Sequence, residues 1–231
     1  MIVYGRNSCY ETLKNSKNIK KVYLDPRFRD KILISLIENL KLKPVFCTKN
    51  ELDELANGNH QGIILDIEEF EYCDIDEIIK ENGFIIMLDH LEDTHNFGAI
   101  IRTCLAAGVD GIIIPKQRSV KVNQTVMKTS SGAAIRSKIC MVANLNHTIK
   151  YLKDKGYWFY AADMNGQNYS QVEYDAKTCL IIGNEGSGVS ELVKKSSDYI
   201  VSIPMKGQFE SLNASVATGI LIYEVVRQRN L

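Results

Sequence analysis

Two polar turns in the last quarter of the chain have the composition of ligand-binding loops. The first, residues 183–188 with the sequence GNEGSG, follows the short apolar run 180–182. The second, residues 204–207, follows the apolar run 200–203. Such runs, bounded by Gly or Pro, are typical of buried strands, and glycine lets a backbone approach a ligand closely. Because ligands bind at the carboxyl ends of strands in open α/β sheets, the two turns predict a binding site.

The polar segment after the second turn is typical of a helix N-terminus. Ser211 or Asn213 can cap a helix, which leaves backbone N–H groups of the first turn free for a ligand. From Val216 onward apolar residues recur with a helical period. Arg227 and Arg229 at the end of this run suit the negative end of the helix dipole. The sequence therefore predicts that a C-terminal helix begins beside the turns.

Three motifs in this chain resemble the signature of the SpoU-type (TrmH-type) 2'-O-ribose RNA methyltransferases, in the SPOUT superfamily. Residues 89–103 (DHLEDTHNFGAIIRT) resemble the first motif, and GNEGSG, IPM and ESLNASVATG, which begins at Glu210, resemble the second and third. Three motifs in the right order are more specific than any one alone. The closest resemblance is to the branch that methylates a guanosine in bacterial 23S ribosomal RNA. Thr94 stands where the family usually has Pro, which would stiffen the turn before the helix.

The resemblance implies an α/β fold with two domains. Residues 1–67 resemble the small L30e-like αβα domain that binds substrate RNA, residues 68–82 read as an acidic linker, and residues 83–231 as the methyltransferase domain. Strands and helices alternate along residues 84–231, which is typical of a mainly parallel sheet. A deep trefoil knot is expected from the resemblance alone, because general topology rules make such threading nearly absent.

Periodicity and punctuation also predict individual elements. In the first domain we expect strands at 21–24, 44–47 and 63–65 and helices at 31–40 and 51–56. In the second we expect strands at 84–88, 111–114, 138–142, 158–162, 180–182 and 200–203, and helices at 96–107, 122–130, 145–155 and from 216 onward.

The family resemblance implies S-adenosylmethionine as cofactor, bound by backbone groups of the second and third motifs. Mapped onto this chain, the expected cofactor-binding residues are Gly183, Ile203, Leu212 and the adjacent Met205. Ile203 and Leu212 suit this role physically, because two apolar side chains can sandwich an adenine while backbone groups contact its edge. The alternative is that both are ordinary core residues.

The same resemblance implies a polar catalytic set of five residues: Asn96, Arg102, Glu185, Ser211 and Asn213. An arginine, whose pKa lies above about 12, is a poor base at neutral pH. We therefore interpret Arg102 as a clamp on the target phosphate. Ser211 and Asn213 would orient the ribose, and Glu185 would hold Asn96 or Arg102 in place, unless Glu185 is only a surface carboxylate.

The net charge of zero alone argues against a nucleic-acid-binding protein, but the charges are unevenly distributed. Residues 1–49 contain eleven basic residues (Lys or Arg) and four acidic ones (Asp or Glu). Residues 50–81 contain one basic and eleven acidic residues, and residues 116–138 contain six basic residues and no acidic one. RNA responds to the local field within a Debye length of about 8–10 Å. Candidate RNA-binding residues are Arg6, His60, Lys116, Arg118 and Lys121. The alternatives are a solvated charged face and, for His60, a residue that holds a turn.

Composition indicates the broad class of the protein. No apolar run approaches the ~20 residues of a membrane span, and the N-terminus does not resemble a secretion signal. Six scattered cysteines without C-x-x-C favour reduced thiols in the cytoplasm. No His shares metal-ligand spacing with a Cys or Asp pair, so no metal is expected. The family works as homodimers, and the helices at 96–107 and 216–226 are candidates for the interface.

Two other functions remain open on the sequence alone. One is a transfer-RNA ribose 2'-O-methyltransferase of the same superfamily, because specificity is not readable from the motifs. The other is an RNA-binding protein that keeps the fold without activity. The presence of Asn96, Arg102, Ser211 and Asn213 favours an active enzyme.

Overall fold

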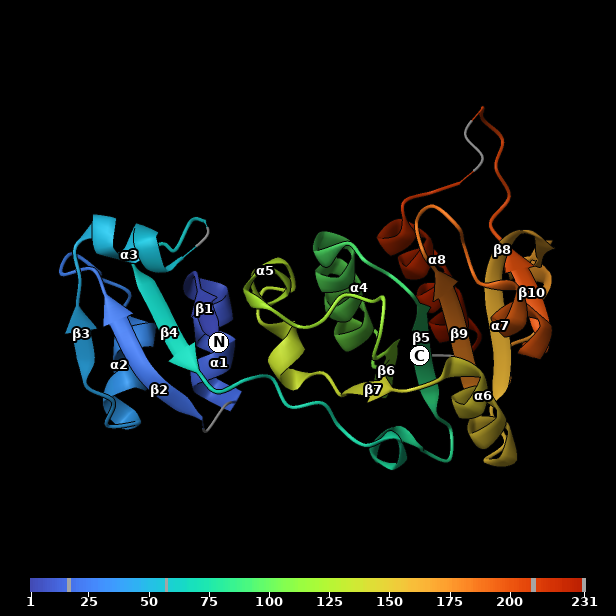
Figure 1. The fold of residues 1–231 in the computed structure, drawn as a ribbon, viewed down its shortest axis with the longest axis horizontal. Coiled ribbons are helices and arrows are strands. Elements are labelled where there is room, and N and C mark those ends of the chain that lie inside the picture. The colour runs from blue at the N-terminus through green and yellow to red at the C-terminus, as the bar shows by residue number, and fades with distance from the viewer. Residues whose placement is uncertain (16–17, 57, 209–210, 230–231) are drawn as a thin grey trace. The chain divides into compact units, whose positions relative to one another are not determined.

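Two segments that are far apart in the sequence belong to the same unit of this structure (Figure 1). The first unit contains Met1–Glu71 and Lys121–Arg136, and the second contains Tyr72–Val120 and Ser137–Leu231. Glu210, the first residue of ESLNASVATG, lies outside the described residues. The computed structural model describes residues 1–15, 18–56, 58–208 and 211–229.

The first unit contains a four-stranded sheet with the strand order β1-β4-β2-β3. Strands β2 and β3 are parallel, and β4 is antiparallel to both of its neighbours. The strands and helices predicted between residues 21 and 65 are confirmed within a few residues. The bounds are β1 (Ile2–Tyr4), α1 (Arg6–Asn15), β2 (Ile19–Leu24), α2 (Lys31–Asn39), β3 (Pro44–Phe46), α3 (Lys49–Leu55) and β4 (Ile63–Ile67).

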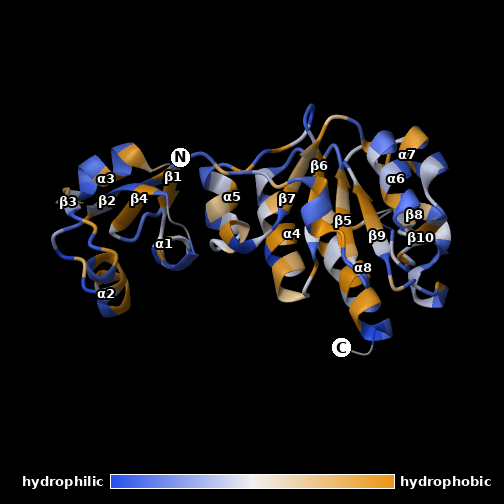
Figure 2. Cartoon of the chain, turned by 90° about the horizontal axis from the view of Figure 1, so that it is seen from below, coloured by the Kyte–Doolittle hydropathy of each residue, from blue (hydrophilic) through white to orange (hydrophobic). Residues whose placement is uncertain are grey.

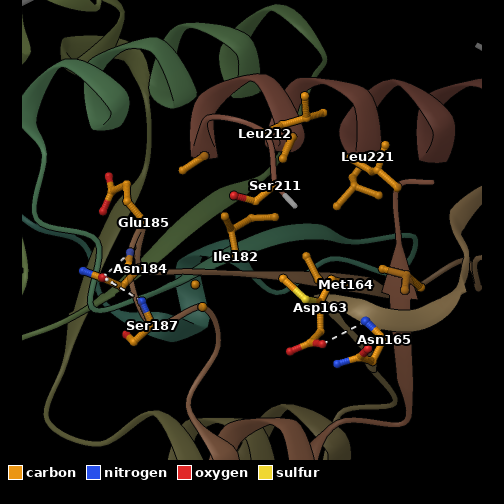
Figure 3. A pocket seen from close by; sticks show the side chains of 18 of the residues that line it. Asp163, Met164, Asn165, Ile182, Asn184, Glu185, Ser187, Ser211, Leu212 and Leu221 are labelled. Atoms are coloured by element: carbon orange, nitrogen blue, oxygen red, sulfur yellow. Dashed lines mark hydrogen bonds between the residues drawn. The ribbon is translucent and has the colours of Figure 1, made fainter. Parts of the chain in front are cut away.

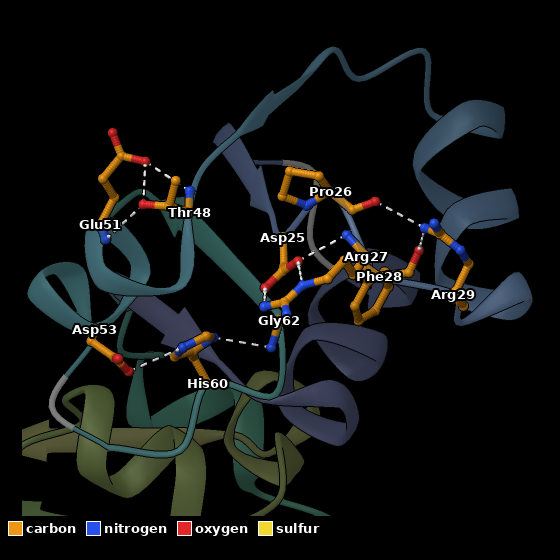
Figure 4. A network of polar contacts seen from close by, with 10 residues as sticks. All are labelled: Asp25, Pro26, Arg27, Phe28, Arg29, Thr48, Glu51, Asp53, His60 and Gly62. Carbon is orange, nitrogen blue, oxygen red and sulfur yellow. Dashed lines mark hydrogen bonds and ion pairs between the residues drawn. The ribbon is translucent and has the colours of Figure 1, made fainter.

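Side-chain caps start two of these helices. The carboxylate of Asp30 accepts a hydrogen bond from the Leu33 N–H at 3.2 Å and caps α2. Thr48 and Glu51 form a reciprocal capping box at the start of α3 (Figure 4). Such caps satisfy backbone N–H groups that have no partner within the helix.

Residues 121–136 pack on β1 and α1. This segment contains α5 (Gln124–Thr129) and the 3-10 helix η2 (Ala133–Arg136). The Ser8 hydroxyl donates a hydrogen bond to the Met127 carbonyl at 3.0 Å, and both residues are buried. Gly132 has a φ of +84° and lies so close to α1 that an added Cβ would be 3.0 Å from Ser8 Cα. The second domain was expected to contain all of residues 83–231, but residues 121–136 belong to the first unit.

The second unit is built on a six-stranded sheet with the order β10-β8-β9-β5-β6-β7. Every paired neighbour in this sheet is parallel, as predicted. All residues of β5 and β6 are buried, and the central strands are strongly apolar along their length (Figure 2). Parallel sheets covered on both faces require such continuous apolar runs. The bounds are β5 (Phe84–Asp89), β6 (Gly111–Pro115), β7 (Ile139–Val142), β8 (Trp158–Asn168), β9 (Thr178–Gly183) and β10 (Tyr199–Ser202).

Helices cover both faces of the parallel sheet (Figure 2). Helix α4 contacts α8, and α6 contacts α7. Along the sheet, the chain moves in one direction from β5 to β6, and in the other direction from β7 to β8 and from β9 to β10. Because crossovers between parallel strands are right-handed, α4 lies on one face of the sheet, and α6 and α7 lie on the other. The bounds are α4 (Thr94–Ala106), α6 (Leu145–Asp154), α7 (Glu191–Ser196), α8 (Ala214–Gln228) and the 3-10 helices η1 (Ile75–Ile78) and η3 (Tyr169–Gln171).

Several predicted elements have different limits in the structure, and two of them concern the site. Strand β8 was expected to end at residue 162, but it continues to Asn168, because Gln167 and Asn168 pair with β10 after an irregularity in the register. Helix α4 was expected from residue 96, but it begins at Thr94 with Asp93 as its cap. Among the helices of the described ranges, none combines the length and apolar character needed to cross a bilayer.

The packing of residues 121–136 on α1 predicts that Gly132→Ala lowers the free energy of unfolding more than Gly108→Ala does. Gly132→Ala forces a φ of +84° on a residue with a Cβ and pushes that Cβ against α1. Gly108→Ala forces a φ of +73° but meets nothing within 4 Å. Backbone strain costs about 1–3 kcal/mol, and overpacking adds about 1–3 kcal/mol. Urea denaturation followed by circular dichroism should show the larger loss for Gly132→Ala, and equal losses would contradict the packing.

Candidate active site

One cavity in the second unit lies beside the three neighbouring strands β8, β9 and β10 (Figure 3). The cavity has a volume of about 320 Å³. Its walls come from the middle of β8, the turn after β9, the segment between β10 and α8, and the first half of α8. This is the edge at which parallel sheets bind ligands. The lining residues are Ala162, Asp163, Met164, Asn165, Ile182, Gly183, Asn184, Glu185, Gly186, Ser187, Gly188, Val201, Ile203, Met205, Ser211, Leu212, Ala214, Ala217 and Leu221.

The turn after β9 is organised by the side chain of Asn184. Its Oδ1 accepts hydrogen bonds from the backbone N–H groups of Gly186 at 2.8 Å and Ser187 at 3.3 Å. The backbones of Asn184 and Gly188 also exchange two hydrogen bonds, at 3.1 and 2.9 Å. Gly183 lies so close that a Cβ on it would be 2.0 Å from the carbonyl carbon of Gly188. Glycine is therefore required at position 183 for the turn to close.

The carboxamide of Asn96 joins two loops that are distant in the sequence. Asn96 lies in the first turn of α4 and is 9% exposed. Its Nδ2 donates a hydrogen bond to Glu185 Oε1 at 2.9 Å, and its Oδ1 accepts one from Asn213 Nδ2 at 2.9 Å. Asn213 also caps α8, because its Oδ1 accepts from the N–H of Ser215 at 3.0 Å. Three of the five predicted catalytic residues therefore form one polar chain.

The two remaining predicted catalytic residues lie in different places. Ser211 lines the cavity, and Arg102 is exposed on α4, about two turns after the helix start. Thr94, where the family usually has Pro, is the first residue of the helix and follows the cap Asp93, whose carboxylate accepts a hydrogen bond from the Asn96 N–H at 2.6 Å. The helix start is therefore held by a side-chain cap without proline.

The four residues predicted to bind the cofactor, Gly183, Ile203, Met205 and Leu212, all line the cavity. Leu212 is 38% exposed, and Ile203 and Met205 are half-buried. None of the three is sealed inside the core, so their side chains have surface available for contact with a ligand.

Sequence reasoning missed the wall that β8 contributes. Asp163, Met164 and Asn165 line the cavity beyond the point where this strand was expected to end. The polar residues after the apolar run 159–162 are the same strand-end signal that identified the two other turns. It was missed because residues 162–166 form an irregular stretch inside β8, between the pair of Ala161 with Ile200 and the pair of Gln167 with Val201.

Asp163 introduces a negative charge at this wall. One carboxylate oxygen accepts a hydrogen bond from the Asn165 N–H at 3.0 Å, and the other lies 3.0 Å from Lys194 Nζ. Burial opposes ionisation of this carboxyl, but the Asn165 N–H and the Lys194 ammonium outweigh it and hold the pKa of Asp163 below its usual range. The cavity therefore has a carboxylate beside its apolar walls at neutral pH.

In the first unit, His60 holds a turn (Figure 4). Its side chain is 7% exposed. Nδ1 accepts a hydrogen bond from the Gly62 N–H at 3.0 Å, and Nε2 lies 3.1 Å from Asp53 Oδ1. Since Nδ1 is an acceptor, Nε2 carries the proton and donates to the carboxylate. These contacts correspond to the turn-holding alternative considered for His60.

The other predicted RNA-binding residues are exposed cations. The Arg6 guanidinium lies over the Phe28 ring at 5.4 Å, and its side chain is 52% exposed. Lys121 is exposed in the first unit, and Lys116 and Arg118 are exposed after β6 in the second unit. Across the described parts of the chain, no group of three or more His, Cys, Asp or Glu side chains is arranged to hold a metal ion.

The Asn96 chain predicts a loss and a rescue of stability. Asn96→Asp keeps the shape but replaces the donor to Glu185 with a second carboxylate, so we expect a loss of about 1–3 kcal/mol in the free energy of unfolding. Adding Glu185→Gln restores a donor and should recover most of it. Urea denaturation of the two single variants and the double variant measures this coupling. Additive losses would show that the two side chains do not interact.

Comparison with known proteins shows the family to which this chain belongs. Residues 83–223 match the SpoU rRNA methylase family, and residues 2–73 match the domain described as RNA 2'-O ribose methyltransferase substrate binding. A Staphylococcus haemolyticus relative, whose name places it among the TrmH family tRNA/rRNA methyltransferases, is 39% identical over 240 residues, or 100% of this chain and 96% of the relative. YacO of Bacillus subtilis, with the same family name, is 35% identical over 238 residues, or 99% and 96% of the two chains.

Solved structures show the same fold. The SpoU methyltransferase AviRb from Streptomyces viridochromogenes, crystallised in complex with AdoMet, matches with a TM-score of 0.89 at 24% identity, covering 100% of this chain and 90% of AviRb. An AdoMet-bound rRNA methyltransferase from Sinorhizobium meliloti matches with a TM-score of 0.84 at 22% identity, covering 100% and 87%. By the family match and the full-length relatives, this chain belongs to the SpoU/TrmH family of RNA methyltransferases.

Proposed function

We propose that this protein transfers a methyl group from S-adenosylmethionine to the 2'-oxygen of a guanosine ribose in bacterial 23S ribosomal RNA. The observation that supports it best is the cavity beside β8, β9 and β10, with the Glu185–Asn96–Asn213 chain attached to its walls. The match of residues 2–73 to an RNA 2'-O ribose methyltransferase substrate-binding domain supports the ribose as acceptor.

The cavity is suited to S-adenosylmethionine. Its volume of about 320 Å³ lies within the range of about 300–1,000 Å³ that is typical of small-molecule sites. Ile203, Leu212 and Leu221 offer apolar surface for an adenine, and the Gly183 turn offers backbone groups for its polar edge. The Asp163 carboxylate suits a positively charged or hydroxyl-bearing part of the ligand. The bound cofactor would supply an activated methyl group on a sulfonium.

Positioning of the RNA would do much of the remaining work, because holding two reactants in line can supply about 7–11 kcal/mol of the barrier. Ser211, which lines the cavity, and Asn213, which caps α8, would orient the ribose. One carboxylate oxygen of Glu185 accepts a hydrogen bond from the Asn96 amide, so the second oxygen of Glu185 is left for other contacts. We assign Arg102 to the target phosphate and not to proton abstraction, because a guanidinium stays protonated at neutral pH.

The proposal includes the assembly around this site. The first unit would bind the RNA substrate through candidate contacts that include Arg6 and Lys121, and Lys116 and Arg118 are further candidate contacts in the second unit. A homodimer is supported by α8, which exposes Val216 (50%) and Tyr223 (52%) seven residues apart on one helix face. The threading of the C-terminal segment into a trefoil knot is part of the same proposal and rests on the family resemblance.

A transfer-RNA substrate is the main alternative, because the names of the relatives include both tRNA and rRNA. Mass spectrometry of nuclease-digested ribosomal and transfer RNA, from cells with and without the protein, separates the two. We expect the loss of one 2'-O-methylguanosine in 23S ribosomal RNA. A loss confined to transfer RNA would contradict the ribosomal assignment, and unchanged methylation of both RNAs would contradict the proposed activity.

The phosphate-clamp role of Arg102 predicts that Arg102→Lys lowers both the methylation rate and RNA affinity. Lysine keeps the charge but loses the fork that contacts two phosphate oxygens at once. We expect an affinity loss of about threefold to tenfold, because charged hydrogen bonds contribute on the order of 1 kcal/mol or more. Arg227→Lys, which replaces an exposed arginine of α8, is the matched control. Full rate and unchanged RNA affinity in Arg102→Lys would rule out the clamp.

A further inference from the structure

A second cleft in the second unit is separate from the cavity described above. It has a volume of about 380 Å³ and lies at the carboxyl ends of β5, β6 and β7 and the starts of α6 and α7. Its polar lining includes His90, Arg118, Asn144 and Asn146. Crevices at this edge are the usual ligand sites of open parallel sheets, yet none of the roles assigned so far uses this one as a site.

A buried carboxylate orients the histidine of this cleft. Asp89, the last residue of β5, is 1% exposed, and its Oδ1 lies 2.5 Å from His90 Nδ1. Its Oδ2 accepts a hydrogen bond from the Ser190 N–H at 2.7 Å. A carboxylate only accepts, so Nδ1 carries the proton and Nε2 is left for a ligand. In the described part of the chain, Nε2 has no hydrogen-bond partner, and the His90 side chain is 34% exposed.

The other polar groups of the cleft are mainly hydrogen-bond donors. Asn144 Oδ1 is occupied by the His147 N–H at 3.0 Å, and Asn146 Oδ1 by the Ser196 hydroxyl at 3.0 Å. The amide N–H groups of both residues have no acceptor within the described residues, and Arg118 adds an exposed guanidinium. Such a set suits a ligand rich in acceptors, such as phosphate and base carbonyl oxygens.

The backbone holds His90 and Arg118 in unfavourable conformations. His90 has a φ of 59° and Arg118 a φ of 50°, which are left-handed conformations that residues other than glycine rarely adopt. The His90 carbonyl accepts a hydrogen bond from Asn184 Nδ2 at 3.0 Å. The next carbonyl, of Leu91, accepts from the Val120 N–H at 2.8 Å, which ties the Arg118 loop to His90. The two side chains therefore lie in one preformed cleft.

The cleft also has apolar surface that a bare anion would leave uncovered. Leu192 lines it and is 69% exposed, and Pro115 and Leu145 lie in the same lining. Glu191 is the acidic member of the lining, but its carboxylate is paired with Lys194 at 2.6 Å. Donors beside apolar surface match the way proteins bind unpaired nucleotides, which pack their bases on side chains while polar groups hold oxygens.

We propose that this cleft binds an unpaired nucleotide of the RNA substrate, distinct from the nucleotide that is methylated. Arg118 and the amides of Asn144 and Asn146 contact phosphate or carbonyl oxygens, His90 contacts a polar group of the nucleotide, and Leu192 packs against the base. Asp89 is a positioning residue that acts through His90. The identity of the ligand as RNA rests on the proposed function.

Binding of a fluorescent single-stranded oligoribonucleotide, measured by anisotropy on the full chain, tests this inference. Arg118→Asn removes the charge but tolerates the left-handed backbone, and Leu192→Ala removes the apolar contact. Each should weaken RNA binding about tenfold or more and leave S-adenosylmethionine binding unchanged. Lys150→Ala, an exposed cation on α6 outside the lining, is the control and should change RNA affinity by less than about twofold.

Each outcome separates the cleft from the methyltransferase activity. If the wild type methylates RNA and both cleft variants bind RNA as tightly as the wild type, the cleft inference fails and the proposed function stands. If both variants lose RNA affinity but the wild type methylates no RNA, the cleft inference stands and the proposed function fails. Tighter binding of guanosine monophosphate or inorganic phosphate than of the oligoribonucleotide, lost in the same variants, would assign the cleft to a free anion and overturn the proposal.

Discussion

The carboxamide of Asn96 is the contact on which the architecture of the site depends. Its Nδ2 donates a hydrogen bond to Glu185 in the turn after β9, and its Oδ1 accepts one from Asn213 at the start of α8. A loop that moves away leaves a nearly buried amide unsatisfied, at a cost of about 1–3 kcal/mol. Asn96, in the first turn of α4, therefore couples the turn after β9 to the start of α8.

The same turn after β9 links the cavity and the second cleft. Asn184 shapes the turn with its Oδ1 and reaches the His90 carbonyl with its Nδ2. The end of the turn is fixed by the bond from the Ser190 N–H to Asp89. Since Asn184 lines the cavity and His90 lines the cleft, a ligand in one site contacts a turn whose other side supports the second site.

Residue types and spacing predicted the parallel sheet and the segments that form the cavity, because apolar strand runs followed by glycine-rich turns are local features. The family resemblance implied Gly183, Ile203, Met205 and Leu212 as cofactor-binding residues, and these four share one cavity. The wall of Asp163 was missed, because β8 continues past its apolar run only through the pairs that Gln167 and Asn168 make with β10. The packing of residues 121–136 on α1 was also missed, since it depends on Ser8 and Gly132, which are far apart in the sequence.

Hydrogen–deuterium exchange with and without S-adenosylmethionine tests the central claim most directly, because it reports where the cofactor binds. If the cavity is the cofactor site, protection should increase together in residues 183–188, in the segment that contains Met205 and Leu212, and at residues 162–165 of β8, while the strands of the first unit stay unchanged. No protection at saturating cofactor, or protection confined to the lining of the second cleft, would contradict the account.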